Sequence, residues 1–220
     1  MSVPRAQGNG RPRRRRRSAR PVDAARRGSL VTPAEESLER FLSGVASTRI
    51  TPSAGAVVAV TGAQAAALCE MVCIHTDATE TTARLTDARE RLGAYRESLL
   101  QLAADDVAAV DGVQATFDGA ADAEPERAAL RRATAVPLQI TETARDVAEA
   151  AVVAGDDGAE SVRTDAVVGA YLARASVASG AQIVRSNLDM YDDESFVRDA
   201  REAVDRAESD AEEAVAAVVG

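Results

Sequence analysis

One stretch of the chain, residues 55–73, reads GAVVAVTGAQAAALCEMVC and carries a single charge, at Glu70. A helix that is apolar on all of its sides belongs in a protein core, and these small side chains would let neighbouring helices approach it closely. The stretch makes a poor membrane span, because most of its apolar content is alanine and because Gln64 and Glu70 interrupt it. It therefore predicts a helical domain built around a central small-residue helix.

The sequence on both sides of this stretch predicts more helices and no strands. Ala, Glu and Arg dominate, and no segment alternates apolar and polar residues with the β-branched enrichment of a strand. We expect helices at about 33–46, 55–77, 79–113, 125–154, 161–188 and 193–218, separated by segments with turn chemistry. Since the connections are short, the expected fold class is all-α, an up-and-down bundle of about six helices.

The first thirty residues differ in composition from the rest of the chain. They hold ten Arg and one acid among Pro and Gly, so we expect residues 1–30 to form a disordered Arg-rich extension and residues 31–220 to form the helical domain. An RNA-binding or membrane-binding tail is the functional alternative. The simpler interpretation is a solvated or spurious extension, because residues 32–35 already supply an N-cap, a first-turn proline and a capping-box Glu. No apolar run follows the arginines, which predicts a cytoplasmic protein without a membrane partner.

The charge of the domain is strongly negative. Residues 31–220 contain 16 Arg and 34 Asp or Glu, a net charge of −18, and the chain contains no Lys. Such a surface is typical of a halophilic protein, whose self-repulsion is screened by a high-salt cytoplasm. We therefore expect no nucleic-acid binding through the folded domain.

The residue types present exclude several kinds of chemistry. A single histidine, His75, cannot supply the ligands of an imidazole-based metal site, and the absence of Lys excludes Schiff-base catalysis. Cys69 and Cys73 share a helix face but lack a third ligand, so we interpret them as small buried side chains.

Two aspartates lie on apolar helix faces and are the candidate catalytic residues. Asp106 interrupts a seam with three- and four-residue spacing, whose other members are Leu92, Tyr95, Leu99, Leu102, Ala109 and Val113. Asp165 lies on a similar stripe with Val162, Val168 and Leu172, which predicts that it points inward. A buried acid with a raised pKa suits general acid–base catalysis. The structural alternatives are a buried ion pair between Asp106 and an Arg, and a helix cap at Asp165.

Five segments in order along the chain point to a known family. They are Thr51-Pro52-Ser53-Ala54-Gly55 before a helix that ends at residues 69–76, Ala104–Ala109, Ala135–Leu138, Thr164–Ala170 and Asn187–Leu188. Together they resemble the cyclodeaminase/cyclohydrolase family, which includes the C-terminal domain of formiminotransferase-cyclodeaminase and the stand-alone methenyltetrahydrofolate cyclohydrolases. The family pattern has a glycine triplet followed by Ser where this chain has Ser53, Ala54, Gly55 and Ala56, and an Asn where it has Ile183.

The resemblance implies a homodimeric helical enzyme that acts on a tetrahydrofolate derivative. The implied reaction is hydrolysis of 5,10-methenyltetrahydrofolate to 10-formyltetrahydrofolate, catalysed by a hydrolase acting on cyclic amidines. The alternatives are a formiminotetrahydrofolate cyclodeaminase, which is an ammonia lyase, and a non-catalytic folate-binding protein. No metal or other cofactor is expected. The implied catalytic residues are Asp106 and Asp165, and the implied substrate-binding residues are Pro52, Gly55, Arg163, Arg185 and Asn187.

Overall fold

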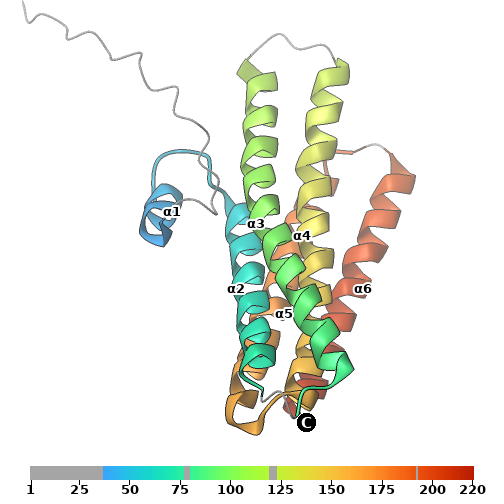
Figure 1. The fold of residues 1–220 in the computed structure, drawn as a ribbon. Coiled ribbons are helices and arrows are strands. Elements are labelled where there is room, and N and C mark those ends of the chain that lie inside the picture. Colours follow the sequence, from blue (N-terminus) through green and yellow to red (C-terminus); the bar gives the residue numbers. More distant parts are fainter. Residues whose placement is uncertain (1–36, 77–79, 119–122, 192) are drawn as a thin grey trace, which may run out of the picture. The chain divides into compact units, whose positions relative to one another are not determined.

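The computed structural model describes residues 37–76, 80–118, 123–191 and 193–220, and every regular element in these residues is helical. The elements are α1 (Leu38–Val45), α2 (Ala54–His75), α3 (Ala83–Asp118), α4 (Ala123–Asp157), a 3₁₀ turn η1 (Glu160–Val162), α5 (Arg163–Leu188) and α6 (Glu194–Val219). Helices α2 to α6 run along one another as a bundle (Figure 1). The predicted all-α bundle of about six helices is thus confirmed.

The helix boundaries differ from the predicted ones by a few residues. Helix α3 continues to Asp118 and α4 to Asp157, past the predicted ends at 113 and 154. The N-cap of α1 is Ser37, whose hydroxyl accepts a hydrogen bond from the Arg40 amide. The predicted capping box at residues 32–35 and the Arg-rich stretch lie outside the described residues.

Helix α2 lies against α3, α4 and α5, and its inward face is made almost entirely of small side chains. Gly169 of α5 faces Cys69, and a β-carbon at residue 169 would overlap the Cys69 sulfur. Both cysteines are buried and free, as predicted. Burial raises the pKa of Cys69 to about 12 and that of Cys73 to about 11, so both thiols stay protonated at neutral pH.

One side of α2 remains outside the core, contrary to the expectation of a helix buried all round. Gln64 and Ile74 are exposed, and Val57, Leu68 and Met71 are half-buried. By length and composition alone, Ala54–His75 and Glu160–Leu188 could each cross a membrane, but about half of each apolar window is buried inside the bundle (50% and 44%). Core helices pass the same test, so the segments are weak evidence for a membrane span.

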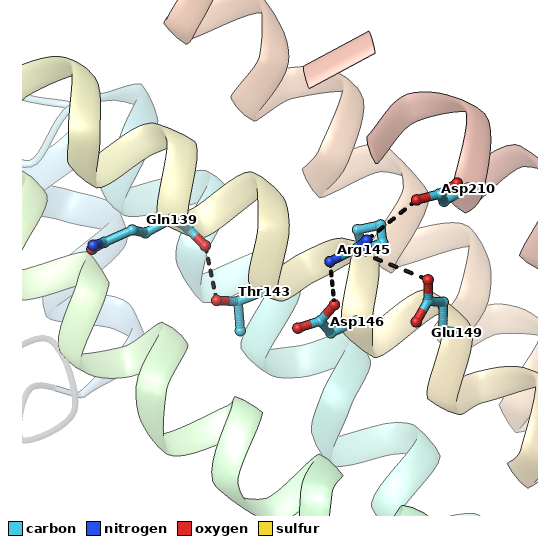
Figure 2. A network of polar contacts seen from close by, with 6 residues as sticks. All are labelled: Gln139, Thr143, Arg145, Asp146, Glu149 and Asp210. Atoms are coloured by element: carbon cyan, nitrogen blue, oxygen red, sulfur yellow. Dashed lines mark hydrogen bonds and ion pairs between the residues drawn. The ribbon is translucent and has the colours of Figure 1, made fainter. Parts of the chain in front are cut away.

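Ion pairs connect the outer surfaces of the helices. Arg145 of α4 contacts Asp146 at 2.8 Å and Asp210 of α6 at 3.3 Å, with Glu149 one turn further along α4 (Figure 2). Burial alone would lower the pKa of Arg145, but these three carboxylates together raise it. The arginines therefore offset part of the acidic charge where helices meet.

A proline inside α4 is matched by an asparagine on α5. Pro137 has no N–H, so the Ala133 carbonyl, four residues earlier, lacks its helical donor. The Asn187 side-chain amide donates a hydrogen bond to this carbonyl at 2.9 Å. Close by, Gly180 of α5 lacks a β-carbon where one would overlap the Thr141 hydroxyl, which itself donates to the Pro137 carbonyl. Asn187 therefore joins α4 and α5 by satisfying a carbonyl that Pro137 leaves free.

This pairing predicts a non-additive effect of two substitutions on stability. Asn187→Ala should lower the free energy of unfolding by about 1 kcal/mol, because the Ala133 carbonyl loses its donor. In a Pro137→Ala background the restored N–H supplies another donor, so the same substitution should cost less. Chemical denaturation of the four proteins measures the difference. Equal costs in both backgrounds would contradict the pairing.

Candidate functional site

The first turn of α2 is bound by a carboxylate from α3. The Ala56 amide donates to Asp106 Oδ2 at 2.9 Å, and the Ser53 hydroxyl donates to the same oxygen at 3.0 Å. Asp106 is 3% exposed. Because the first amides of a helix have no partners within it, a carboxylate at this position completes the helix from outside.

The pKa of Asp106 is raised above the ordinary value of 3.8. Burial raises it, and the hydrogen bonds from Ser53 and Ala56 partly oppose this by stabilising the ionised form. No arginine among the described residues pairs with Asp106 or shifts its pKa, so the predicted alternative of a buried ion pair is wrong for this part of the chain. The neighbouring Asp105 is the residue that pairs with an arginine, Arg132, at 3.5 Å.

Gly55 allows this close approach. A β-carbon at residue 55 would overlap the Asp106 carboxylate, so any larger residue would force the two helices apart. Gly55 thus lies at the site through its contact with Asp106, and its predicted role in substrate binding stays a prediction.

A cavity of about 830 Å³ opens beside Ser53. Its walls come from the end of α1 and the following loop, the start of α2 and the second half of α5. The described lining residues are Val45, Arg49, Ile50, Pro52, Ser53, Ala54, Val57, Val58, Ala178, Ser179, Gln182 and Ile183. The wall is mainly apolar with a few polar groups, which is the usual character of a small-molecule site.

Arg49 is the charged residue among the described residues of the cavity wall. Its guanidinium lies over Gly44, where a β-carbon would approach one of its nitrogens to 2.7 Å. The backbone amide of Arg49 donates to the Ser47 hydroxyl at 3.2 Å, whereas within the described residues its exposed guanidinium makes no hydrogen bond or ion pair. It is therefore free to contact an anionic ligand.

The second candidate aspartate lies at the other end of the bundle. The start of α5 adjoins the end of α2, because the Ala159 amide donates to the Thr76 hydroxyl at 3.0 Å. Asp106 contacts the start of α2, and Asp165 lies near its end. The two aspartates are therefore separated by most of the length of α2, roughly 25 Å at 1.5 Å per residue. The prediction that Asp165 points inward is wrong, since it is half-buried and Val168 on the same stripe is 42% exposed.

The predicted binding residues of α5 are occupied elsewhere in the fold. Arg163 donates to the Val218 carbonyl at the end of α6, at 3.3 Å. Arg185 pairs with Glu208 and Asp205 of α6, and hydrogen bonds from these two carboxylates raise its pKa. Asn187 binds the Ala133 carbonyl. Of the predicted binding residues, Pro52 lines the cavity and Gly55 contacts Asp106. Arg163, Arg185 and Asn187 lie at neither place.

Two residues at the cavity were not predicted. Ser53 follows a proline at the start of α2, which suggests only a helix cap, yet its hydroxyl makes no cap hydrogen bond. Arg49 lies in the segment between α1 and α2, where sequence periodicity carries no information about neighbours. Both positions depend on where α1 and α5 lie relative to α2.

Comparisons with known proteins cover most of the described chain. Residues 37–206 match the sequence profile of the formiminotransferase-cyclodeaminase family. The chain belongs to this family. It is 34% identical over 176 residues to a methenyltetrahydrofolate cyclohydrolase from Methylorubrum extorquens, a match that covers 74% of this chain and 85% of the relative.

A solved structure of the family has the same fold. The formiminotetrahydrofolate cyclodeaminase of Thermotoga maritima superposes with a TM-score of 0.79 at 26% sequence identity, covering 84% of this chain and 94% of the other. The family resemblance inferred from the five segments is therefore confirmed. Asp106, Ser53 and the cavity residues all fall within the family match.

Proposed function

We propose that this family member is a methenyltetrahydrofolate cyclohydrolase, which hydrolyses 5,10-methenyltetrahydrofolate to 10-formyltetrahydrofolate. The observation that carries the proposal is a buried carboxylate with a raised pKa, Asp106, separated from a cavity by one hydroxyl. The cavity volume of about 830 Å³ suits a ligand of pterin size. The named activity of the Methylorubrum extorquens relative supports the same substrate.

The chemistry of this reaction matches the groups available. Hydrolysis of an amidinium carbon needs a water molecule, a base to deprotonate it and a proton for the departing ring nitrogen. Asp106 is the proposed base, and its negative charge would also stabilise the cationic substrate. No step requires a metal or a redox cofactor, so we propose none. The free thiols of Cys69 and Cys73 agree with a cytoplasmic location.

An aspartate pair tests the role of Asp106. Asp106→Asn should lower kcat by ~10² to 10⁴, because a neutral amide cannot accept the proton. Asp105→Asn should have a much smaller effect, since Asp105 pairs with Arg132 away from the cavity. The absorbance decay of methenyltetrahydrofolate, measured in high salt, gives both rates.

The melting temperature separates catalysis from stability in this test. Asn can still accept the hydrogen bond from Ala56, so Asp106→Asn should fold and melt close to the wild type. Equal losses of turnover in the two variants, or a folded Asp106→Asn protein with full turnover, would contradict the assignment.

The second candidate activity is that of a cyclodeaminase, because the superposed Thermotoga maritima structure carries that name. Both reactions act on a tetrahydrofolate derivative: the cyclohydrolase adds water and opens the methenyl ring, whereas the cyclodeaminase releases ammonia as a ring closes. Release of ammonia from 5-formiminotetrahydrofolate, without hydrolysis of the methenyl compound, would identify the cyclodeaminase. Folate binding without either reaction would identify a non-catalytic member of the family.

We propose that Arg49 binds the glutamate carboxylates of the folate substrate, a role for which Arg163 or Arg185 was the candidate from the sequence. Arg49→Gln should raise the KM for the folate substrate about tenfold with little change in kcat, because one charge-assisted hydrogen bond is lost. Arg163→Gln should leave KM unchanged. Steady-state kinetics of both variants provide the measurement, and the reverse pattern would return the role to Arg163.

We also propose a homodimer formed through the outer faces of α2 and α5. The outer positions of α2 are uncharged and lie exposed or half-buried: Ala54, Val57, Thr61, Gln64, Leu68 and Met71. Exposed positions of α5 include Val168, Tyr171, Ala175, Ala178 and Gln182, with Arg174 as a charged neighbour. Val57, Ala178 and Gln182 also line the cavity, so a second chain on this face would help to enclose it. Asp165 could act at a cavity only across such an interface.

A charge placed on this face tests the dimer. Gln64→Arg should convert the dimer to a monomer, because the exposed glutamine lies mid-way along the uncharged stripe and a buried arginine would lack a partner. Ala216→Arg, at an exposed position of α6, is the matched control and should remain dimeric. Light scattering with size-exclusion chromatography in molar salt gives the masses. A monomeric wild type, or a dimeric Gln64→Arg variant, would contradict the proposal.

A further inference from the structure

The proposed base does not itself form part of the cavity wall. Asp106 is 3% exposed, and the described residues that line the cavity do not include it. Ser53 does line the cavity, and its hydroxyl is 3.0 Å from Asp106 Oδ2. A water molecule in the cavity would therefore meet Ser53 before Asp106.

The Ser53 hydroxyl is oriented for this intermediate position. It occupies the N-cap of α2 but makes no cap hydrogen bond, and its proton is directed to Asp106. A serine hydroxyl carries one proton and two lone pairs. With the proton engaged by Asp106, the lone pairs remain available to accept a hydrogen bond from water on the cavity side.

We propose that Ser53 relays a proton between water in the cavity and Asp106. The inference rests on the proposed cyclohydrolase function. As the water oxygen forms a bond to the amidinium carbon, one water proton passes to Ser53 Oγ and the serine proton passes to Asp106 Oδ2. When the bond from carbon to the ring nitrogen breaks, the same path returns a proton to that nitrogen. The remaining hydroxyl proton leaves to solvent as the formyl C=O forms, so one proton is released overall.

The charged groups around Ser53 and Asp106 contact other residues or are exposed to solvent. On α3 itself, Asp105 pairs with Arg132 of α4, and Asp111 accepts a hydrogen bond from Thr51. The first half of α2 carries no charge, and Arg49 before it is exposed. From α5, the cavity receives Ala178, Ser179, Gln182 and Ile183, all uncharged. The hydroxyl of Ser53 and the amide of Ala56 are thus the groups that hold the ionised form of Asp106.

Removal of the hydroxyl should change both rate and pH dependence. Ser53→Ala should lower kcat at least about tenfold with little effect on KM, because the proton path to Asp106 is interrupted. The hydrogen bond from Ser53 lowers the pKa of Asp106, so its loss should raise that pKa and move the acid limb of the kcat/KM profile to higher pH. Ser53→Thr keeps a hydroxyl and should restore both the rate and the position of the limb.

A second serine provides the structural control. Ser176 of α5 is buried and donates to the Val58 carbonyl of α2 at 3.0 Å. Ser176→Ala should lower the melting temperature without moving the acid limb, since this hydroxyl does not reach Asp106. Given an active wild type, the relay is overturned if Ser53→Ala has the same kcat as the wild type or the same acid limb of the kcat/KM profile. It is also overturned if Ser53→Thr restores neither the rate nor the position of the limb. A wild type without any turnover would instead overturn the proposed function.

Discussion

The hydrogen bonds from the start of α2 to Asp106 are the interaction on which the rest of the site depends. Asp106 comes from α3, 50 residues further along the chain than Ala56, so one carboxylate both completes α2 and fixes it against α3. The positive end of the helix dipole favours the ionised form, as do the two hydrogen bonds. Burial nevertheless outweighs them and raises the pKa. The fold thus holds a carboxylate that binds a proton more readily than an exposed one.

This constraint explains the altered glycine run of the chain. The family pattern has three glycines, and the one retained here, Gly55, is the one that abuts Asp106. Ala54 is exposed, and Ser53 lines the cavity with its hydroxyl bonded to Asp106, so the fold has room for a side chain at each of these two positions. The sequence predicted α2 from its small, apolar composition and the buried Asp106 from the apolar spacing along α3, whereas Gly55 was singled out through the family resemblance.

The remaining site residues could not be predicted, because their roles depend on contacts between distant helices. The spacing around Asp165 suits either an inward stripe or the flank of a helix, and the small residues of α5, such as Gly169 and Gly180, decide which face is buried. From the sequence alone, Arg185 and Asn187 have the side-chain chemistry of ligand-binding residues. Their partners lie on α6 and α4, and the need for Asn187 arises from a carbonyl that Pro137 leaves free.

The same small residues shape the outer surface of the bundle. Because Ala and Gly bring α2 and α5 close together, the larger apolar side chains of these helices, such as Leu68 and Tyr171, are left on the outside. Most acids lie on helices other than α2 and α5. Arg145 of α4 and Arg185 of α5 each pair with an acid of α6. A second chain docked on the α2–α5 face would keep those acidic helices at its periphery. Repulsion between two domains of net charge −18 would then act mostly across solvent, where salt screens it most effectively.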